Sequence, residues 1–144
     1  MAKFHHYLMF NGNTVEAMKF YQSVLGGEMG ETMLFKDSPM GEKLSEEDGN
    51  KVMHTGLSLG DDVYLMANDT LESMGGPAVF GSHHFICISP DSVEQGKKYF
   101  EGLSAGGTVA MPFEKQFWGS YHGNFKDKFG IHWMIDCHDP DQQK

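Results

Sequence analysis

The sequence predicts an α+β fold built from two tandem βαβββ copies, and internal repetition is the first reason. Residues 5–25 align without a gap with residues 83–103, at an offset of 83 − 5 = 78. A second block aligns His54 with His122, at an offset of 122 − 54 = 68. The second reason is that each copy shows strand, helix and strand patterns in the same order. We therefore expect a cupped, mostly antiparallel β-structure with the helices outside.

The first copy begins with the apolar and aromatic run FHHYLMF, which predicts a strand. In the turn NGNT that follows, Asn13 or Thr14 can cap a helix. Apolar residues at helical spacing predict that helix over residues 15–25. The pair Gly26 and Gly27 predicts its end, because a residue with positive φ is favoured there.

The rest of the first copy predicts three strands and one long loop. Residues 28–35 are a plausible strand, and the polar stretch 36–50 is expected to be a mobile surface loop that could cover a pocket as a flap. Residues 51–69 predict a hairpin that turns at the sequence Gly-Asp-Asp, residues 60–62.

The second copy repeats this order after a linker at residues 70–82. Its expected elements are a strand in 83–89, a helix over 93–103, a strand over 108–114, and a hairpin over 117–137 that turns at residues 126–130. The copies span about 4–69 and 82–137. Each copy alone would be marginal at roughly 70 residues, so we expect one domain with a shared core.

Charge and composition exclude several partners. The 144 residues carry 11 Lys and Arg against 20 Asp and Glu, a net charge of −9, so nucleic acid and anionic membranes are poor partners. No apolar stretch approaches the length of a membrane span or a secretion signal. Cys87 and Cys137 lie in apolar runs without CxxC spacing, so we expect buried, reduced thiols and a cytoplasmic location.

Several short motifs carry a resemblance to a known family. They are YLMFNGN at residues 7–13, EAMKFY at 16–21, LGG at 25–27, HTGL at 54–57, YLMAND at 64–69, FWG at 117–119 and DKFGIHW at 127–133. Together they resemble the vicinal oxygen chelate superfamily, which includes glyoxalase I, bleomycin-resistance proteins and extradiol dioxygenases, and within it the PhnB-like branch. The resemblance runs from about Tyr7 to Ile135, and it implies a glyoxalase-like fold and a homodimer.

In the metal-dependent members of that superfamily, strand residues hold a divalent ion that stabilises negative charge on the substrate. By this resemblance, the histidine ligands would fall at His6, His54, His84 and His122. The carboxylate ligands would fall near Met66 and Met134, and neither residue can supply one. In that arrangement water, or a displaced carboxylate such as Asp69 or Asp136, would complete the shell. We therefore expect no metal cofactor, with a divalent metal as the alternative.

The favoured hypothesis is a small organic ligand bound in a sheet-lined pocket. On an ideal strand His6 shares a face with Leu8 and Phe10, an apolar face that suits a pocket floor or core, whereas His5 and His83 point the other way. The expected pocket residues are His6, His54, His84, Phe117, Trp118, Tyr121 and His122. The alternatives are a metal-dependent lyase, isomerase or dioxygenase with a His-rich shell, and a degenerate member selected only for assembly. The sequence identifies neither a ligand nor a catalytic activity.

Overall fold

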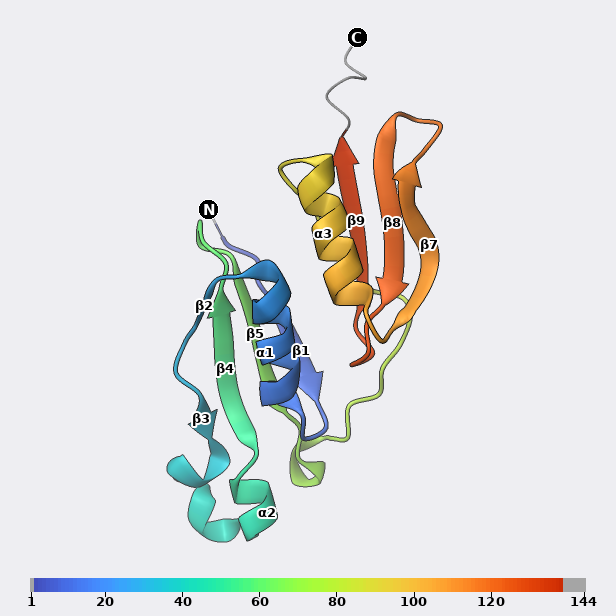
Figure 1. The fold of residues 1–144 in the computed structure, drawn as a ribbon. Helices are drawn as coiled ribbons and strands as arrows, with labels where there is room; N and C mark the ends of the chain where they lie inside the picture. Colours follow the sequence, from blue (N-terminus) through green and yellow to red (C-terminus); the bar gives the residue numbers. More distant parts are fainter. Residues whose placement is uncertain (1, 139–144) are drawn as a thin grey trace. The chain divides into compact units, whose positions relative to one another are not determined.

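The computed structural model describes residues 2–138 of the chain, and these form two compact units. The N-terminal unit ends at Val79 and the C-terminal unit begins at Phe80. Each unit contains one long helix and one sheet (Figure 1). The order of elements in both units is βαβββ, with the third element of the first unit divided, so the predicted α+β repeat is confirmed.

The N-terminal unit holds a five-stranded sheet, here called sheet 1, with the order β1-β5-β4-β2 and with β3 paired to β4. Strands β1 and β5 are parallel, and the other pairs are antiparallel. The elements are β1 (His6–Phe10), α1 (Thr14–Leu25), β2 (Glu28–Met29), β3 (Met33–Leu34), β4 (Val52–Ser58) and β5 (Tyr64–Asp69). Short helices are η1 (Phe35–Asp37), η2 (Gly41–Lys43), α2 (Glu46–Gly49) and η3 (Glu72–Met74).

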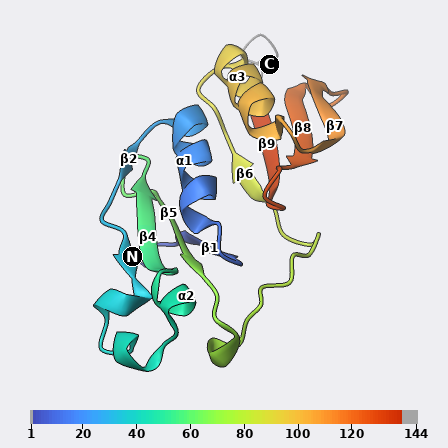
Figure 2. The same ribbon diagram turned by 60° about the horizontal axis from the view of Figure 1, so that its bottom comes forward.

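Helix α1 lies along one face of sheet 1, beside β4 and β5 (Figures 1 and 2). Met18 and Tyr21 of the helix are fully buried, as are Leu57 and Ala67 of the strands. Burial of a side chain as large as Met18 or Leu57 contributes about 1.5–3 kcal/mol through its removal from water. Gly26 and Gly27 end the helix at φ values of 78° and 89°, as the sequence predicts.

The start of α1 is held by Asp69 rather than by a local cap. Asn13 occupies the N-cap position, but its side chain makes no capping hydrogen bond. Asp69 Oδ1 instead accepts hydrogen bonds from the Gly12 and Thr14 backbone N–H groups and from Thr14 Oγ1. Its Oδ2 accepts a fourth from the Val52 N–H. One buried carboxylate thereby joins β5, β4 and the β1–α1 turn.

Two expectations for the first copy are wrong in detail. The strand expected over residues 28–35 is divided into β2 and β3, because the Gly30 N–H bonds to the Gly56 carbonyl outside a regular ladder and the pairing register shifts between Met33 and Leu34. The stretch at 36–50 is not irregular, because it folds into the rest of η1 and into η2 and α2. Ser45 caps α2 by accepting a hydrogen bond from the Asp48 N–H. The mobility of this stretch stays a prediction.

The C-terminal unit holds a four-stranded sheet, here called sheet 2, with the order β6-β9-β8-β7. Its elements are β6 (Ile86–Ile88), α3 (Val93–Ser104), β7 (Thr108–Lys115), β8 (Ser120–Lys126) and β9 (His132–His138). Strands β6 and β9 are parallel and the other two pairs are antiparallel. Figures 1 and 2 show α3 alongside β9 and β8.

Helix α3 packs closely on sheet 2. Ser92 caps its first turn by accepting a hydrogen bond from the Gln95 N–H. The helix approaches the sheet at Phe100, whose ring lies 5.0 Å from that of Phe125, centroid to centroid. Gly123 leaves room for this contact, since a Cβ there would lie 2.7 Å from the Phe100 ring.

The repeat alignment is correct for the hairpins but wrong for the first strand of the second copy. Gly56 pairs with Met66, and Asn124 pairs with Met134, which keeps the offset of 68. In the first strands, Tyr7 pairs with Met66 and Cys87 pairs with Met134, so the offset is 87 − 7 = 80 rather than 78.

This shift changes which residue corresponds to His6. Strand β6 begins at Ile86, and His84 precedes it as an exposed residue. Ile86 is buried and pairs with the buried Trp133, a position that favours an apolar side chain over an imidazole. His84 is therefore not the structural counterpart of His6. Among residues 2–138, no helix is long and apolar enough to cross a membrane.

Candidate functional site

A hollow of about 630 Å³ lies against sheet 1 in the N-terminal unit. It is lined by His5, Glu28, Met29, Gly30, Glu31, His54, Gly56, Ser58, Tyr64 and Met66. Residues of β4 and β5 alternate in burial: Leu57 and Leu65 face the helix, and their neighbours line the hollow. The hollow therefore lies on the face of sheet 1 opposite α1. We call it the sheet-1 hollow.

Two aromatic contacts organise the wall of this hollow. The Tyr7 hydroxyl lies 3.2 Å from His54 Nδ1, and the two rings are 5.8 Å apart. The His5 ring meets the Tyr64 ring edge-on at 5.4 Å. Burial raises the pKa of the Tyr7 phenol, so the hydroxyl keeps its proton at neutral pH and can donate to His54 Nδ1. A neutral His54 that accepts there carries its own proton on Nε2.

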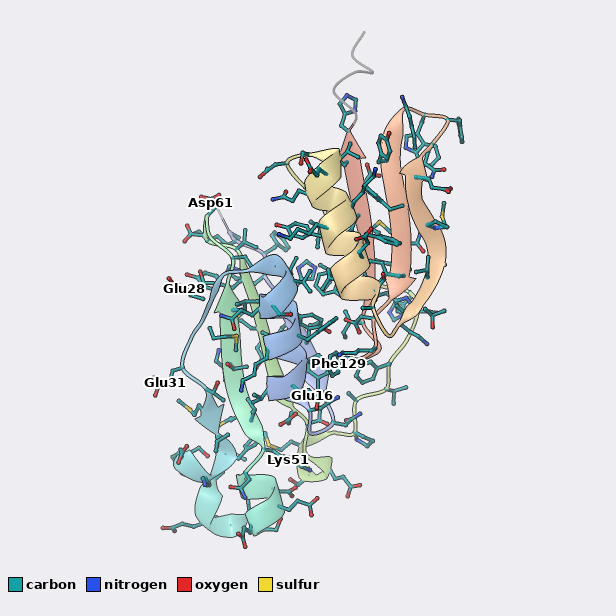
Figure 3. All side chains as sticks on the ribbon, viewed as in Figure 1. Glu16, Glu28, Glu31, Lys51, Asp61 and Phe129 are labelled. Carbon is teal, nitrogen blue, oxygen red and sulfur yellow. The ribbon has the colours of Figure 1, made fainter. Side chains whose placement is uncertain are left out.

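Two carboxylates belong to the segment between α1 and β3. Glu28 and Glu31 both line the hollow and are exposed to solvent (Figure 3). Met29 between them is half-buried and also lines the hollow. The hollow therefore combines thioether and aromatic surface with a few polar groups at its edge. Such a composition is typical of small-molecule sites.

Of the two pocket histidines predicted in the first copy, one lines the hollow and the other does not. His54 lines the hollow, as expected of a pocket residue. His6 is exposed and is not one of the lining residues, because it shares the opposite face of β1 with Leu8 and Phe10. His5, which the sequence analysis assigned to the surface or the helix side, lines the hollow through its contact with Tyr64. Along β1, Leu8 and Phe10 are less exposed than Tyr7 and Met9, and this alternation shows that His5 and His6 lie on opposite faces.

In the C-terminal unit, a polar cluster lies on the face of sheet 2 opposite α3. His122 of β8 pairs with Asp136 of β9, and His122 Nδ1 lies 3.2 Å from Asp136 Oδ2. Asn124 Nδ2 lies 3.4 Å from His122 Nε2. The Trp118 ring meets the His122 ring edge-on at 6.3 Å. Asp136 and Asn124 therefore contact the two ring nitrogens from different sides.

The other pocket residues predicted in the second copy do not join this cluster. Tyr121 points toward the helix side, where its ring packs on Phe113, since neighbouring strand residues face opposite ways. Phe117 is 97 % exposed in the β7–β8 turn and contacts Trp118 edge-on. His84 lies before β6. Within the C-terminal unit, Trp118 and His122 are the two predicted residues that come together.

The cysteines differ in burial. Cys87 is exposed and Cys137 is buried, so the expectation that both are buried is wrong for Cys87. Cys87 lies on the helix-free face of edge strand β6, next to Met134 of β9. Partial burial, followed by the charge of Asp136, raises the pKa of the Cys87 thiol.

Two buried carboxylates have structural roles instead of site roles. Asp69, considered above as a substitute metal ligand, uses both oxygens to accept hydrogen bonds within the N-terminal unit. In the C-terminal unit, Asp127 accepts hydrogen bonds from the Phe129 and Ile131 N–H groups and from Trp133 Nε1. These bonds confirm the turn expected at residues 126–130.

Among the residues that the structure describes, no three His, Cys, Asp or Glu side chains form a group that could hold a metal ion. The sheet-1 hollow offers His54 beside a tyrosine, and sheet 2 offers His122 beside Asp136.

Comparison with known proteins agrees with this fold. The sequence is 32% identical over 138 residues to protein YjdN of Escherichia coli strain K12, covering 90% of this chain and 91% of that protein. The structure matches protein PA1353 of Pseudomonas aeruginosa with a TM-score of 0.84 and 33% identity, covering 96% and 98% of the two chains. It matches the PhnB protein of Bacillus cereus with a TM-score of 0.75 and 22% identity, covering 94% and 99%.

The family profile described as glyoxalase/bleomycin resistance protein/dioxygenase superfamily matches residues 3–135. This range contains the first βαβββ copy and the second copy as far as Ile135 of β9. The chain therefore belongs to the glyoxalase/bleomycin resistance protein/dioxygenase superfamily.

Proposed function

We propose that this protein binds a small organic molecule in the sheet-1 hollow, without a standard chelated metal. The observation that carries the proposal is the hollow itself. Its volume of about 630 Å³ lies within the ~300–1,000 Å³ of typical ligand sites. It lies on the helix-free face of sheet 1, where side chains do not have to pack against α1.

The walls of the hollow favour a ligand with an apolar body and one or two polar groups. Tyr64 and Met66 supply aromatic and thioether surface, and methionine adapts its shape to irregular ligands. With the Tyr7 hydroxyl donating to Nδ1, the His54 ring offers an Nε2–H donor for a ligand oxygen. Tyr7 thus fixes the orientation of His54, a predicted pocket histidine that lines the hollow.

The donor sets support binding without a metal. Met66, at the position where the family resemblance implies a carboxylate ligand, lines the hollow with a thioether. Asp69, the nearby carboxylate in sequence, points into the core and is fully used there. We further propose that the chain belongs to the PhnB-like branch, on the motifs FNG, FWG and DKFG together with the fold shared with the Bacillus cereus protein.

Gly56 permits a direct test. A Cβ at this position would lie 3.6 Å from Met66 Cγ, an ordinary contact, and it would project from the face that lines the hollow. Gly56→Leu should therefore fold and fill the hollow. The control Ala110→Leu adds bulk at an exposed position of β7, outside the hollow.

The experiment is a melting scan of the untagged protein against a library of small organic molecules, followed by titration of each compound that stabilises it. Stabilisation should saturate with compound concentration as mass action requires. The apparent affinity should be at least tenfold weaker in Gly56→Leu and unchanged in Ala110→Leu. Equal stabilisation of all three proteins would refute the hollow as the site. Near-stoichiometric metal by elemental analysis would refute the metal-free part of the proposal.

A further inference from the structure

Another cavity, of about 430 Å³, belongs to the N-terminal unit and lies at one end of sheet 1. Its walls come from three connecting segments: the β1–α1 turn, the stretch that leads through α2 into β4, and the stretch after β5. We call it the end cavity. The described residues that line it do not overlap with those of the sheet-1 hollow. They are Asn11, Ser45, Glu47, Asp48, Lys51, Thr70, Glu72 and Pro77.

Hydrogen bonds within the walls hold these segments in place. The Asn11 side chain clasps the stretch after β5, because its Nδ2 donates to the Ala78 carbonyl and its Oδ1 accepts from the Ala78 N–H. The same Oδ1 also accepts from Thr70 Oγ1. In the second segment, Ser45 Oγ accepts from the Asp48 N–H. These bonds use amide and hydroxyl groups, so the shape of the cavity does not depend on its side-chain carboxylates.

The end cavity carries a net negative charge. Its walls hold the carboxylates of Glu47, Asp48 and Glu72, and among the described lining residues Lys51 is the one cation. Figure 3 shows Lys51 beside α2, just before β4. Lys51 Nζ lies 3.1 Å from Asp48 Oδ1, and these side chains are 27% and 34% exposed, so the pair is partly shielded from water. The two glutamates then leave a charge of −2 in the walls.

The surroundings of Lys51 show which sign of ligand the cavity attracts. The hydrogen bond with Asp48 raises the pKa of Lys51, and partial removal from water opposes this effect. The charges of Asp48, Glu47 and the buried Asp69 raise the pKa further. The potential at the ammonium group is therefore negative even where the wall carries its positive charge. An anion would be repelled by these carboxylates, whereas a cation is attracted.

The two remaining carboxylates belong to different walls. Glu47 lies in α2 and Glu72 lies in η3, and both are exposed to solvent. Between them, Thr70 Oγ1 uses its proton to bond to Asn11 and keeps lone pairs that can accept a hydrogen bond. Pro77 adds apolar surface. This arrangement fits an apolar chain with a cationic donor at each end.

We propose that the end cavity binds a small aliphatic diamine in its doubly protonated form. One ammonium group donates to Glu47 and the other donates to Glu72, and the carbon chain between them passes Pro77. Thr70 Oγ1 is a further acceptor for either ammonium group. This site goes beyond the proposed function, since it lies on connecting segments at the end of the sheet and uses no residue of the sheet-1 hollow.

The test compares two probes that differ by one ammonium group. 1,4-Diaminobutane carries two, and butylamine has the same carbon chain with one; both are protonated at pH 7. Isothermal titration of the full chain at low salt should show the diamine binding about three- to tenfold more tightly, the range for one further ammonium–carboxylate contact at a partly exposed site. Amide spectra should shift at residues 45–51 and 70–77, and not at Gly56 or Met66 of the hollow.

Variants separate a built site from general charge attraction. Glu47→Gln and Glu72→Gln should each reduce the preference for the diamine, and the double variant should abolish it. Both side chains are exposed, so these variants should fold. Glu31→Gln is the matched control, because it removes the same charge from the sheet-1 hollow and should leave the preference unchanged. Lys51→Gln should strengthen diamine binding, because it removes a positive charge and releases Asp48 as an acceptor.

Several results would overturn the proposal: no binding of the diamine to the parent, equal affinity for the two amines, or a preference that survives in the double variant. A loss of preference in Glu31→Gln as large as in the single variants of the end cavity would show general charge attraction instead of a site. Displacement of the diamine by equimolar magnesium chloride, with shifts at residues 45–51, would make the cavity a metal site and would overturn the diamine as its ligand.

Discussion

Replacement of Asp69 should be among the most destabilising single changes in the N-terminal unit. Its side chain is buried, and its two oxygens accept four hydrogen bonds from two other segments, the β1–α1 turn and β4. In Asp69→Ala, three backbone N–H groups and one hydroxyl lose their acceptor. Each hydrogen bond to a charged group contributes about 1.5–3 kcal/mol, although water entry and relaxation make the losses less than additive. We expect a loss of about 3–5 kcal/mol in the free energy of unfolding.

Asp69→Asn refines the argument, because the two oxygens have different partners. An amide oxygen in place of Oδ1 keeps the three bonds to Gly12 and Thr14. The amide nitrogen then faces the Val52 N–H, which leaves two donors opposed. The expected loss is about 1–3 kcal/mol.

Urea unfolding, with the midpoint and slope measured separately, gives both values. Hydrogen exchange should locate the loss at the Gly12, Thr14 and Val52 amides. The control is Glu72→Gln, an exposed carboxylate whose replacement should change stability by no more than about 0.5 kcal/mol. A loss below about 1 kcal/mol in Asp69→Ala would refute the assignment of Asp69 as the link between the three segments.

Three further predictions rest on contacts elsewhere in the two units. Gly123→Ala should lower the free energy of unfolding by about 1–3 kcal/mol or more, because its Cβ would lie 2.8 Å from the Phe113 backbone. Urea unfolding measures the loss, and an unchanged stability would contradict the packing of β8. Ser92→Ala should cost about 1 kcal/mol through loss of the α3 cap, whereas Asn13→Ala, at the uncapped start of α1, should cost clearly less. Cys87 should react with iodoacetamide at pH 7.5 more slowly than free cysteine, because its raised pKa lowers the thiolate fraction. Asp136→Asn should speed the reaction modestly. Equal rates in the parent and in Asp136→Asn would show that the charge of Asp136 is not a cause of the raised pKa.

The sequence alone predicted the repeated βαβββ order, because apolar periodicity, glycine pairs and turn residues are local signals. The helix ending at Gly26 and the hairpin turning at residues 60–62 are examples, since a positive φ is required where each chain segment turns. The sequence also predicted the offset of 68 between the two hairpins, because the paired residues are the same distance apart in the sequence in both.

Tertiary structure decided which residues meet. Sequence matching aligned His84 with His6, whereas strand pairing puts Ile86 at that position, because burial against Trp133 selects an apolar residue regardless of sequence similarity. The same holds for His5, whose contact with Tyr64 joins residues distant in the chain.

The candidate sites show the same division. Sequence selected His54 and His122 as site residues, because they occupy matching places in the two copies. It could not select their partners, since Tyr7 reaches His54 across sheet 1, and Asp136 faces His122 only through the register of β8 and β9. Local patterns determine the type and order of the elements. Pairing between distant strands determines the chemistry, because a hydrogen bond depends on a few tenths of an ångström that no local pattern specifies.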